Sequence, residues 1–360
     1  MKGEYAPQNA RFVYGTKASA MNLTVYSQDL ISGTSGNFTA PVANLSPSTD
    51  YYYRAELDVW DPSQKTYVTV SGTIQSFRTK AESPIPDVPG YLINYEVPAV
   101  SLSGTYTSDN EYYDSGRMWY RYNCTNANQA VATHTWTSGG KAMRNYTVMM
   151  DGSRKCALWC AFAMHATAWA DNNVGRNDGW KTDPAFPPEW QGAGVSGYSK
   201  GHLCASNYRQ TTTNQNKQTF YYTNQAPQFQ TGFNDGVWNQ LEQAVKSHAP
   251  SGSDTLYVVV GVLFENDNTI DGVSIPSHFY KCLMKCKFNS SGELTDANGC
   301  AYLFTNASHK GESYSSFITS IDAIEERSGI DFFPFVTQRL EELEKADTAA
   351  KAESNKTSIF

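Results

Sequence analysis

Charged side chains are scarce in this sequence, and cationic ones are the scarcer kind. Only 18% of the 360 residues are charged, and 28 Lys and Arg against 35 Asp and Glu give a formal net charge of −7. This balance weighs against a broadly cationic surface, which supplies most of the affinity for nucleic-acid backbones. The charge is uneven, because residues 141–246 hold ten Lys and Arg against seven Asp and Glu, whereas residues 310–360 hold six against ten. A local cationic site within 141–246 stays compatible with the composition.

Long apolar runs are also missing. No stretch approaches the roughly 20 consecutive apolar residues of a membrane-spanning helix, so we expect no membrane span. The N-terminal residues MKGEYAPQNARF contain no apolar run and are not a signal peptide as they stand. Together with the domain make-up described below, this predicts a secreted, periplasmic or cell-surface protein whose leader is absent from this sequence. The oligomeric state is left open.

The seven cysteines lack the spacing of a zinc site. Cys156/Cys160 and Cys282/Cys286 are C-x3-C pairs, whereas zinc knuckles use closer pairs or nearby His ligands. Both pairs lie in apolar, strand-like segments, where residues four apart share one face. We expect buried thiols, since cysteine is among the most buried residue types. A disulfide from one pair to another strand is the alternative.

Residues 1–80 carry short β-type segments and no helical periodicity. The segments lie at 11–15, 22–27, 37–42, 51–60, 67–72 and 74–79, between turn residues. This spacing predicts a small all-β sandwich. The stretch LSPSTDYYYRAEL at 45–57 resembles the signature of fibronectin type III domains, which implies a spacer or adhesion module with a tyrosine corner at Tyr51 or Tyr53. Residues 81–115 are predicted to be a linker and lead-in, beginning with the Pro-rich AESPIPDVPG.

Residues 116–345 are predicted to form a second domain of the α+β class. Asp151-Gly152 marks a turn between two strands, and the apolar runs at 255–264 and 277–288 predict two more. Residues 238–247 carry apolar side chains at helical spacing. A further helix is expected after a capping pair of Thr319 and Asp322, with Gly329 as its stop. The polar residues 346–360 are predicted to be a flexible tail.

The residues that could carry chemistry gather between 199 and 246. SKGH at 199–202 places His202 on a strand, and residues 219–223 are predicted as a second strand. A loop over 224–234 and a helix from 236 follow. This order is a ββα arrangement, which brings His202 opposite Asn234 at the helix entrance. Glu242 lies eight residues after Asn234, just over two helical turns, and so projects from nearly the same face.

This segment resembles the DNA/RNA non-specific endonucleases of the ββα-metal type. The family pattern is Asp-Arg-Gly-His, then Phe-Tyr-x-x-Asn-x-x-Pro-Gln, then Asn-x-x-x-Trp-x-x-Leu-Glu. The matching stretches are SKGH at 199–202, FYYTNQAPQ at 220–228 and NDGVWNQLE at 234–242, flanked by RNDGWKTDP at 176–184, IPSHFYKC at 275–282 and SGIDFFP at 328–334. The resemblance covers most of the second domain. It implies a ββα-metal nuclease fold with a mostly antiparallel sheet and a few helices.

The resemblance also implies a metal-dependent endonuclease that hydrolyses phosphodiester bonds of DNA and RNA. Neutral His202 would be the general base that takes a proton from the attacking water. Asn234 would hold Mg²⁺ or Mn²⁺, because such an ion needs few protein ligands. Glu242 would support the hydrated cation from nearby. A site that contacts phosphate and metal, and not base edges or the 2′-hydroxyl, is expected to cut both nucleic acids.

Two positions depart from the family pattern. Ser199 stands where the family has Asp, and Lys200 where it has Arg. Lys keeps the positive charge but loses the bidentate grip on a phosphate, so weaker catalysis or altered metal dependence is expected. Arg176, Lys200 and Lys246 are candidates to hold the phosphate, with ordinary solvated charges as the alternative. Asn224 is a candidate to support the loop or the backbone of His202.

Two other functions stay open. One is a non-enzymatic surface protein that uses an inactive nuclease fold to bind nucleic acid, motivated by Ser199, Lys200 and the negative net charge. The other is a carbohydrate-binding or glycan-processing protein, motivated only by the aromatic content and the sandwich, and it lacks a convincing carboxylate pair. Arg209 is predicted to be a surface residue or an ion-pair partner. The remaining histidines are predicted to be structural or exposed: His134, His165, His248, His278 and His309.

Overall fold

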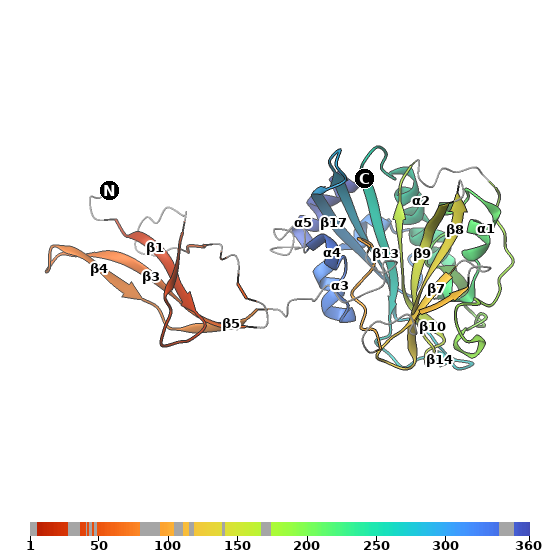
Figure 1. Ribbon diagram of the computed structural model, residues 1–360, viewed down its shortest axis with the longest axis horizontal. Helices are drawn as coiled ribbons and strands as arrows, with labels where there is room; N and C mark the ends of the chain where they lie inside the picture. The colour runs from red at the N-terminus through yellow and green to blue at the C-terminus, as the bar shows by residue number, and fades with distance from the viewer. Residues whose placement is uncertain are drawn as a thin grey trace. The chain divides into compact units, whose positions relative to one another are not determined.

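The chain divides into two compact units, Met1–Pro86 and Asp87–Phe360, in the computed structural model (Figure 1). The structure describes residues 6–27, 37–40, 42, 45–46, 49–79, 94–103, 111–114, 119–138, 141–166, 174–337 and 349–360. The first unit contains only strands among these residues, and the second combines strands with short helices.

The first unit is an antiparallel sheet built around one long strand. Its strand order is β2-β1-β3-β4, and β5 also pairs with β3. Tyr51 is buried, and its hydroxyl accepts a hydrogen bond from the backbone N of Ser46 at 3.0 Å. This link to the upstream backbone is the geometry of a tyrosine corner, and it selects Tyr51 over Tyr53. The strands are β1 Gln8–Gly15, β2 Leu23–Tyr26, β3 Asp50–Asp61, β4 Thr66–Ser71 and β5 Gln75–Arg78.

The predicted sandwich needs a second sheet, and the described residues of this unit form only one. The strand expected at 37–42 is not found, since the described residues 37–40 and 42 lie outside any strand. The all-β character of the unit is therefore confirmed, whereas its fibronectin type III identity stays a prediction.

The second unit is built on a nine-stranded antiparallel sheet with the strand order β18-β17-β16-β13-β10-β9-β8-β7-β6. The turn at Asp151 between β9 and β10 lies where the sequence predicts it. The strands are β6 Glu111–Asp114, β7 Trp119–Asn123, β8 Gln129–Ser138, β9 Lys141–Asp151, β10 Cys156–Met164, β13 Thr255–Leu263, β16 His278–Phe288, β17 Leu294–Thr305 and β18 Ile318–Thr319.

Alternation along each strand divides the apolar side chains between the two faces of this sheet. In β13, Leu256, Val258 and Val260 belong to one core, whereas Tyr257 and Val259 belong to the other. Both faces are covered, which explains why β13 reads as a continuous apolar run.

The helices and short elements flank the sheet (Figure 1). Trp238 and Leu241 enter the first core together with Ile359, and Val97 and Ile324 enter the second. The helical segments are η2 Pro188–Trp190, η3 Ser206–Tyr208, α1 Thr213–Gln218, η4 Tyr222–Asn224, η5 Gln230–Trp238, α2 Asn239–Ser247, η6 Tyr314–Phe317, α3 Ile321–Ser328, α4 Pro334–Thr337 and α5 Ala349–Ile359. Two small pairs complete the unit, β11 Ser199–His202 with β12 Gln225–Gln228, and β14 Thr269–Ile270 with β15 Val273–Ser274.

Three expectations on local structure were wrong. Residues 219–223 are not a strand, because α1 ends there and η4 follows, so the strand begins at Gln225. The cap of α3 is Ser320, whose hydroxyl accepts from Ala323 N at 3.1 Å, and not Thr319. Gly329 does end α3, with φ of 69°. Residues 349–360 are not a loose tail, since α5 buries Ala352 and Ile359 and the Asn355 amide donates to Gly299 O at 2.9 Å.

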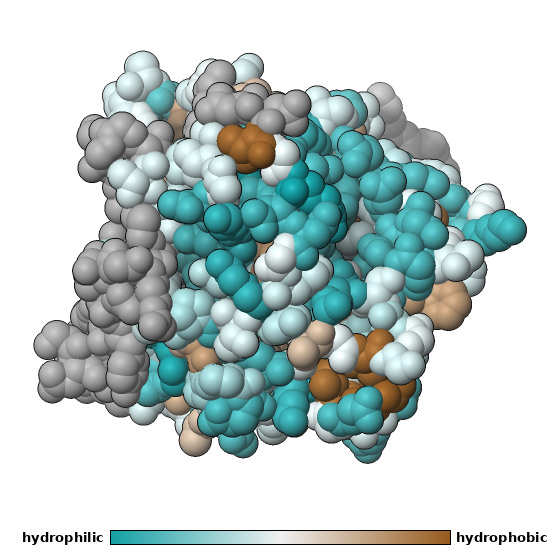
Figure 2. Space-filling view, turned by 90° about the vertical axis from the view of Figure 1, so that its right-hand side faces the viewer, coloured by the Kyte–Doolittle hydropathy of each residue, from teal (hydrophilic) through white to brown (hydrophobic). Residues whose placement is uncertain are grey.

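The surface of the second unit that faces the viewer in Figure 2 is largely hydrophilic, with a few gathered apolar side chains. No helix in the described ranges is long and apolar enough to cross a bilayer. The seven cysteines are buried, and no disulfide joins them in the described structure, as the sequence predicts.

Candidate active site

A ββα unit carries most of the predicted site residues. Strand β11 pairs antiparallel with β12, with His202 opposite Gln225 and Ser199 opposite Gln228. Segment η5 and helix α2 follow β12 directly. Trp238 is fully buried where η5 meets α2 and fixes the helix to the large sheet. The arrangement expected from the sequence is thus present, with its second strand placed later than predicted.

His202 lies against two aromatic rings. Its imidazole is 4.7 Å from the Trp180 ring and 4.9 Å from the Phe220 ring, measured between centroids. Lys200 shares this face of β11, since residues two apart on a strand point the same way, and its Nζ lies 5.9 Å from the Trp180 ring. The imidazole of His202 and the ammonium group of Lys200 therefore lie on the same side of β11, beside the Trp180 ring.

The surroundings of His202 favour its neutral form. Burial lowers the pKa of His202 from 6.5 to about 3, and the charge of Arg176 lowers it as well, against a smaller opposing effect of Asp178. Its Nε2 is buried and has no hydrogen-bond partner among the described residues. A neutral imidazole has one nitrogen that can accept a proton, as a general base must, while a pKa this low makes His202 a weaker base than an ordinary histidine.

Gly201 permits the close approach of β11 and β12. A Cβ at Gly201 would lie 2.2 Å from Gln228 Oε1 and 2.6 Å from Gln228 Cβ. Gln228 is fully buried, so it has little room to move. The Gly between Lys200 and His202 is therefore required by packing.

Asn224 ties the segment after His202 to the loop that precedes β12. Its Oδ1 accepts from Cys204 N at 2.8 Å, and its Nδ2 donates to Cys204 O and Thr219 O, both at 2.9 Å. Its own carbonyl accepts from Leu203 N at 3.1 Å. One buried amide thus fixes the backbone directly beyond His202, which is the supporting position expected from the sequence.

Asn234 lies in η5, where the backbone departs from helical geometry at several residues. Its Nδ2 donates to Gln230 Oε1 at 2.9 Å, and the Ser199 hydroxyl donates to the same oxygen. These contacts orient the amide so that Oδ1 accepts no hydrogen bond from the described residues. Ser199, where the family has Asp, thus connects β11 to the segment that carries Asn234.

Glu242 lies in the first turn of α2 and is partly buried. Burial raises its pKa, and the charge of Lys281, the Trp238 side chain and the charge of Arg176 oppose that rise. The Tyr208 hydroxyl donates to the backbone carbonyl of Glu242 at 3.0 Å and fixes this turn of the helix.

Arg176 is a cation whose charge acts on both His202 and Glu242. It is exposed, its Nε donates to the Asp178 carboxylate, and its guanidinium lies 5.1 Å from the Phe220 ring. Its charge acts on both His202 and Glu242, which places the three side chains in one electrostatic neighbourhood. Lys246 lies in the last turn of α2, half-buried.

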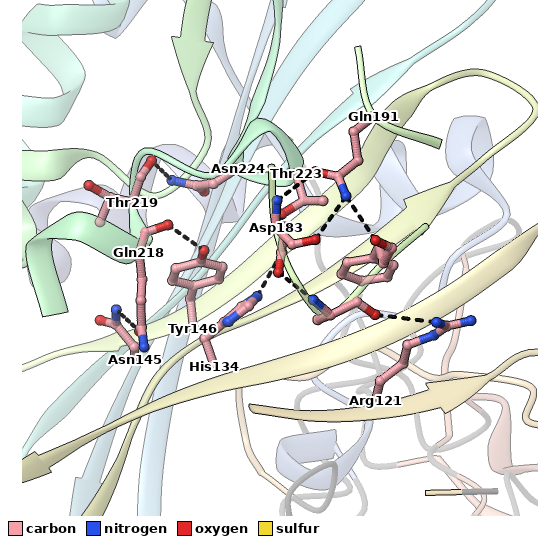
Figure 3. Close-up of polar contacts among 12 residues, drawn as sticks. Arg121, His134, Asn145, Tyr146, Asp183, Gln191, Gln218, Thr219, Thr223 and Asn224 are labelled. Atoms are coloured by element: carbon pink, nitrogen blue, oxygen red, sulfur yellow. Dashed lines mark hydrogen bonds and ion pairs between the residues drawn. The ribbon is translucent and has the colours of Figure 1, made fainter. Parts of the chain in front are cut away.

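A buried polar network lies behind this region (Figure 3). His134 Nε2 and Asp183 Oδ2 are 2.9 Å apart with both side chains fully buried, and the Thr223 hydroxyl donates to the same oxygen. The Gln191 amide accepts from Asp183 N at 2.7 Å and donates to Asp183 O at 2.9 Å. His134 is therefore structural, as expected, although its partner Asp183 was missed. The sequence signal for Asp183 was the WKTDP stretch at 180–184, which was predicted only as a flank of the ββα segment.

Arg209 is fully buried, so the surface position that the sequence offered as one alternative is wrong. It donates to the backbone carbonyls of Asn145, Tyr208 and Ala163 at 3.1, 3.0 and 2.9 Å. This cation therefore holds the fold together behind the site and is not available to a phosphate.

A strand-borne His, an amide at a helix entrance and neighbouring cations thus lie on and around one ββα unit. The family model of DNA/RNA non-specific endonucleases matches residues 125–338, more than half of the chain. The chain therefore belongs to this family, as the sequence predicts, and it is a nuclease of the α+β class.

Several curated proteins are similar to this chain. A nuclease of Nostoc sp. is 27% identical over 205 residues, which cover 54% of this chain and 73% of that protein. Human mitochondrial endonuclease G is 26% identical over 227 residues, with 58% and 74% covered, and a nuclease of Serratia marcescens is 28% identical over 199 residues, with 51% and 71% covered. A solved structure of an EndoG/EndoGI complex covers 56% of this chain and 86% of that chain at 24% identity, with a TM-score of 0.45.

Proposed function

We propose that this chain is a metal-dependent, sugar-nonspecific endonuclease in which His202 is the general base and Asn234 holds Mg²⁺ or Mn²⁺. The observation that carries the proposal is His202, which lies partly buried on β11 against Trp180 and Phe220, next to a segment whose Asn234 amide is oriented with its oxygen unengaged. DNA and RNA are the proposed substrates, because none of these groups needs a base edge or a 2′-hydroxyl.

The donor set fits a hydrated hard cation. Within the described ranges, no three His, Cys, Asp or Glu side chains are grouped to hold a metal ion. Asn234 Oδ1 is an oxygen donor that accepts nothing from the described residues. Mg²⁺ commonly takes one or two protein oxygens and keeps several waters. Bound there, a divalent cation would offset the negative charge that gathers on the phosphoryl and leaving oxygens.

The side chains around the cation would carry out proton transfer and phosphate binding. His202 accepts the proton of the attacking water, since it is unprotonated at neutral pH. Arg176 and Lys200 hold the phosphate by charge, and Lys200 does so as a point charge without a bidentate grip. Ser199 keeps the Asn234 region in place through Gln230. Glu242, on α2, would accept hydrogen bonds from the waters around the cation. Lys246 is a further candidate for phosphate contact.

The first unit and the location of the protein belong to the same proposal. The tyrosine corner at Tyr51 supports a fibronectin type III-like module. Such a module supports a secreted, periplasmic or cell-surface nuclease. Fractionation of the source cells with an antibody to the second unit tests this, and a signal confined to the cytosol would contradict it.

The test of the activity is cleavage of plasmid DNA and of RNA by the purified chain with Mg²⁺, Mn²⁺ or a chelator. His202→Ala should lower the rate by about 10²- to 10⁴-fold, the contribution of a general base. His248→Ala, an exposed His at the end of α2, is the matched control and should cut as the wild type does. Salt-sensitive nucleic-acid binding without cleavage under any divalent metal would instead establish an inactive nuclease fold.

A further inference from the structure

Lys281 is a buried cation near the site that the proposed reaction does not use. Lys281 on β16 is fully buried, and its Nζ has no hydrogen-bond partner among the described residues. The Nζ lies 4.4 Å from the Trp238 ring and 5.9 Å from the Tyr208 ring. Aromatic faces attract a cation, but they replace only part of the hydration that an ammonium loses on burial. A chain that keeps such a charge incurs a cost in stability.

The position of Lys281 in the sheet explains what it faces. Phe279 and Leu283, two residues to either side, belong to the core beneath α2. Lys281 therefore points to the same face, toward the helix that carries Glu242. Trp238, which the ammonium contacts, is one helical turn before Glu242 and borders its side chain.

The charges of Lys281 and Glu242 act on each other. Burial lowers the pKa of Lys281 to about 8, and the charges of Glu242 and of Cys204 oppose that shift. The charge of Lys281 is in turn the largest influence that opposes the burial-induced rise in the pKa of Glu242. The titratable groups around the pair are Cys204, Tyr208 and Arg176. No other buried cation faces Glu242 in the described part of the chain.

We propose that Lys281 is a positioning residue whose buried ammonium, held against Trp238, is the internal counter-charge that keeps Glu242 ionised beside the cation site. The catalytic consequence rests on the proposed nuclease function, whereas the electrostatic relation between the two side chains does not. A neutral Glu242 would be a poorer acceptor for the water around a bound cation. Loss of such an outer group typically lowers metal affinity or activity by about 10- to 100-fold.

Lys281→Met separates this role from a structural one. Met has a similar length and no charge, so the variant keeps the packing against Trp238 and removes the charge that acts on Glu242. Lys285→Met is the matched control, since Lys285 lies on the same face of β16, four residues on and only half-buried. If Lys281 served packing alone, its replacement would leave the ionisation of Glu242 unchanged.

The deciding measurement is the titration of the Glu242 carboxyl by NMR with ¹³C-labelled Glu, assigned with Glu242→Gln. In Lys281→Met its midpoint should move to higher pH, while Lys285→Met should match the wild type. Calorimetry with Mn²⁺ near neutral pH should show about tenfold weaker binding in Lys281→Met, and the acidic limb of the cleavage profile should move in the same direction. An unchanged Glu242 midpoint would overturn the proposal. Absence of cleavage by the wild type would overturn the proposed function alone, because the NMR titration needs no activity.

Discussion

His202 should remain neutral at a pH where an ordinary histidine is protonated. Burial between Trp180 and Phe220, together with the charge of Arg176, lowers its pKa from 6.5 to about 3. At pH 5 roughly 99% of the His202 imidazole would be neutral, against roughly 3% for a solvent-exposed histidine. Acidification from pH 7 to pH 5 should therefore leave the general base competent in the free enzyme.

The assay follows the His202 ring directly, because carboxylates also titrate in this range. The chemical shift of the His202 Cε1 proton is recorded between pH 2.5 and 8, with His202→Gln for assignment. Trp180→Ala should raise the midpoint, since water then reaches the ring, and Arg176→Gln should raise it because a repelling charge is lost. A midpoint between 6 and 7 in the wild type would refute the burial of the ring.

The same shift has a consequence for stability. Between pH 6.5 and about 3 the unfolded chain binds a proton on His202 that the folded chain does not. The contribution of His202 to the free energy of unfolding is therefore fully present above pH 6.5 and is lost as the pH falls toward about 3. From pH 6.5 to pH 5 this amounts to about 2 kcal/mol, at about 1.4 kcal/mol per pH unit. His202→Gln should reduce the loss of urea stability over this interval, and an identical loss in both proteins would contradict the linkage.

Three further predictions concern single side chains around the site. Asn234→Ala should abolish calorimetric Mn²⁺ binding with an unchanged circular dichroism spectrum, and retained binding would remove Asn234 as the ligand. Asn224→Ala should lower the free energy of unfolding in urea by about 3 kcal/mol, since three buried hydrogen bonds to Cys204 and Thr219 lose their partner; a loss below about 1 kcal/mol would show that water replaces the amide. Gly201→Ala should lower both stability and cleavage, because its Cβ would overlap the buried Gln228 side chain; wild-type thermal stability would show that β11 and β12 can separate.

The sequence by itself was sufficient for several elements of the second unit. Continuous apolar runs predicted the strands β13 and β16, because both faces of this sheet are covered. The spacing of Trp238, Leu241 and Val245 predicted α2. The stretch at 199–242 placed His202 on a strand and Asn234 at a helix entrance. The β-type residues at 219–223 predicted a strand, but they form a turn. The buried Asn224 amide donates to the Thr219 carbonyl and holds this turn in place.

The tertiary structure alone decided which distant side chains meet. His134 and Asp183 form a buried pair although 49 residues separate them, and Arg209 is enclosed by backbone carbonyls from other elements. Periodicity states which face of an element is buried, but it carries no information on the partner across the core. For the same reason the sequence did not distinguish Lys281 from the other lysines of its strand. Only the packing of α2 over β16 shows that this lysine is buried against Trp238 and acts on Glu242.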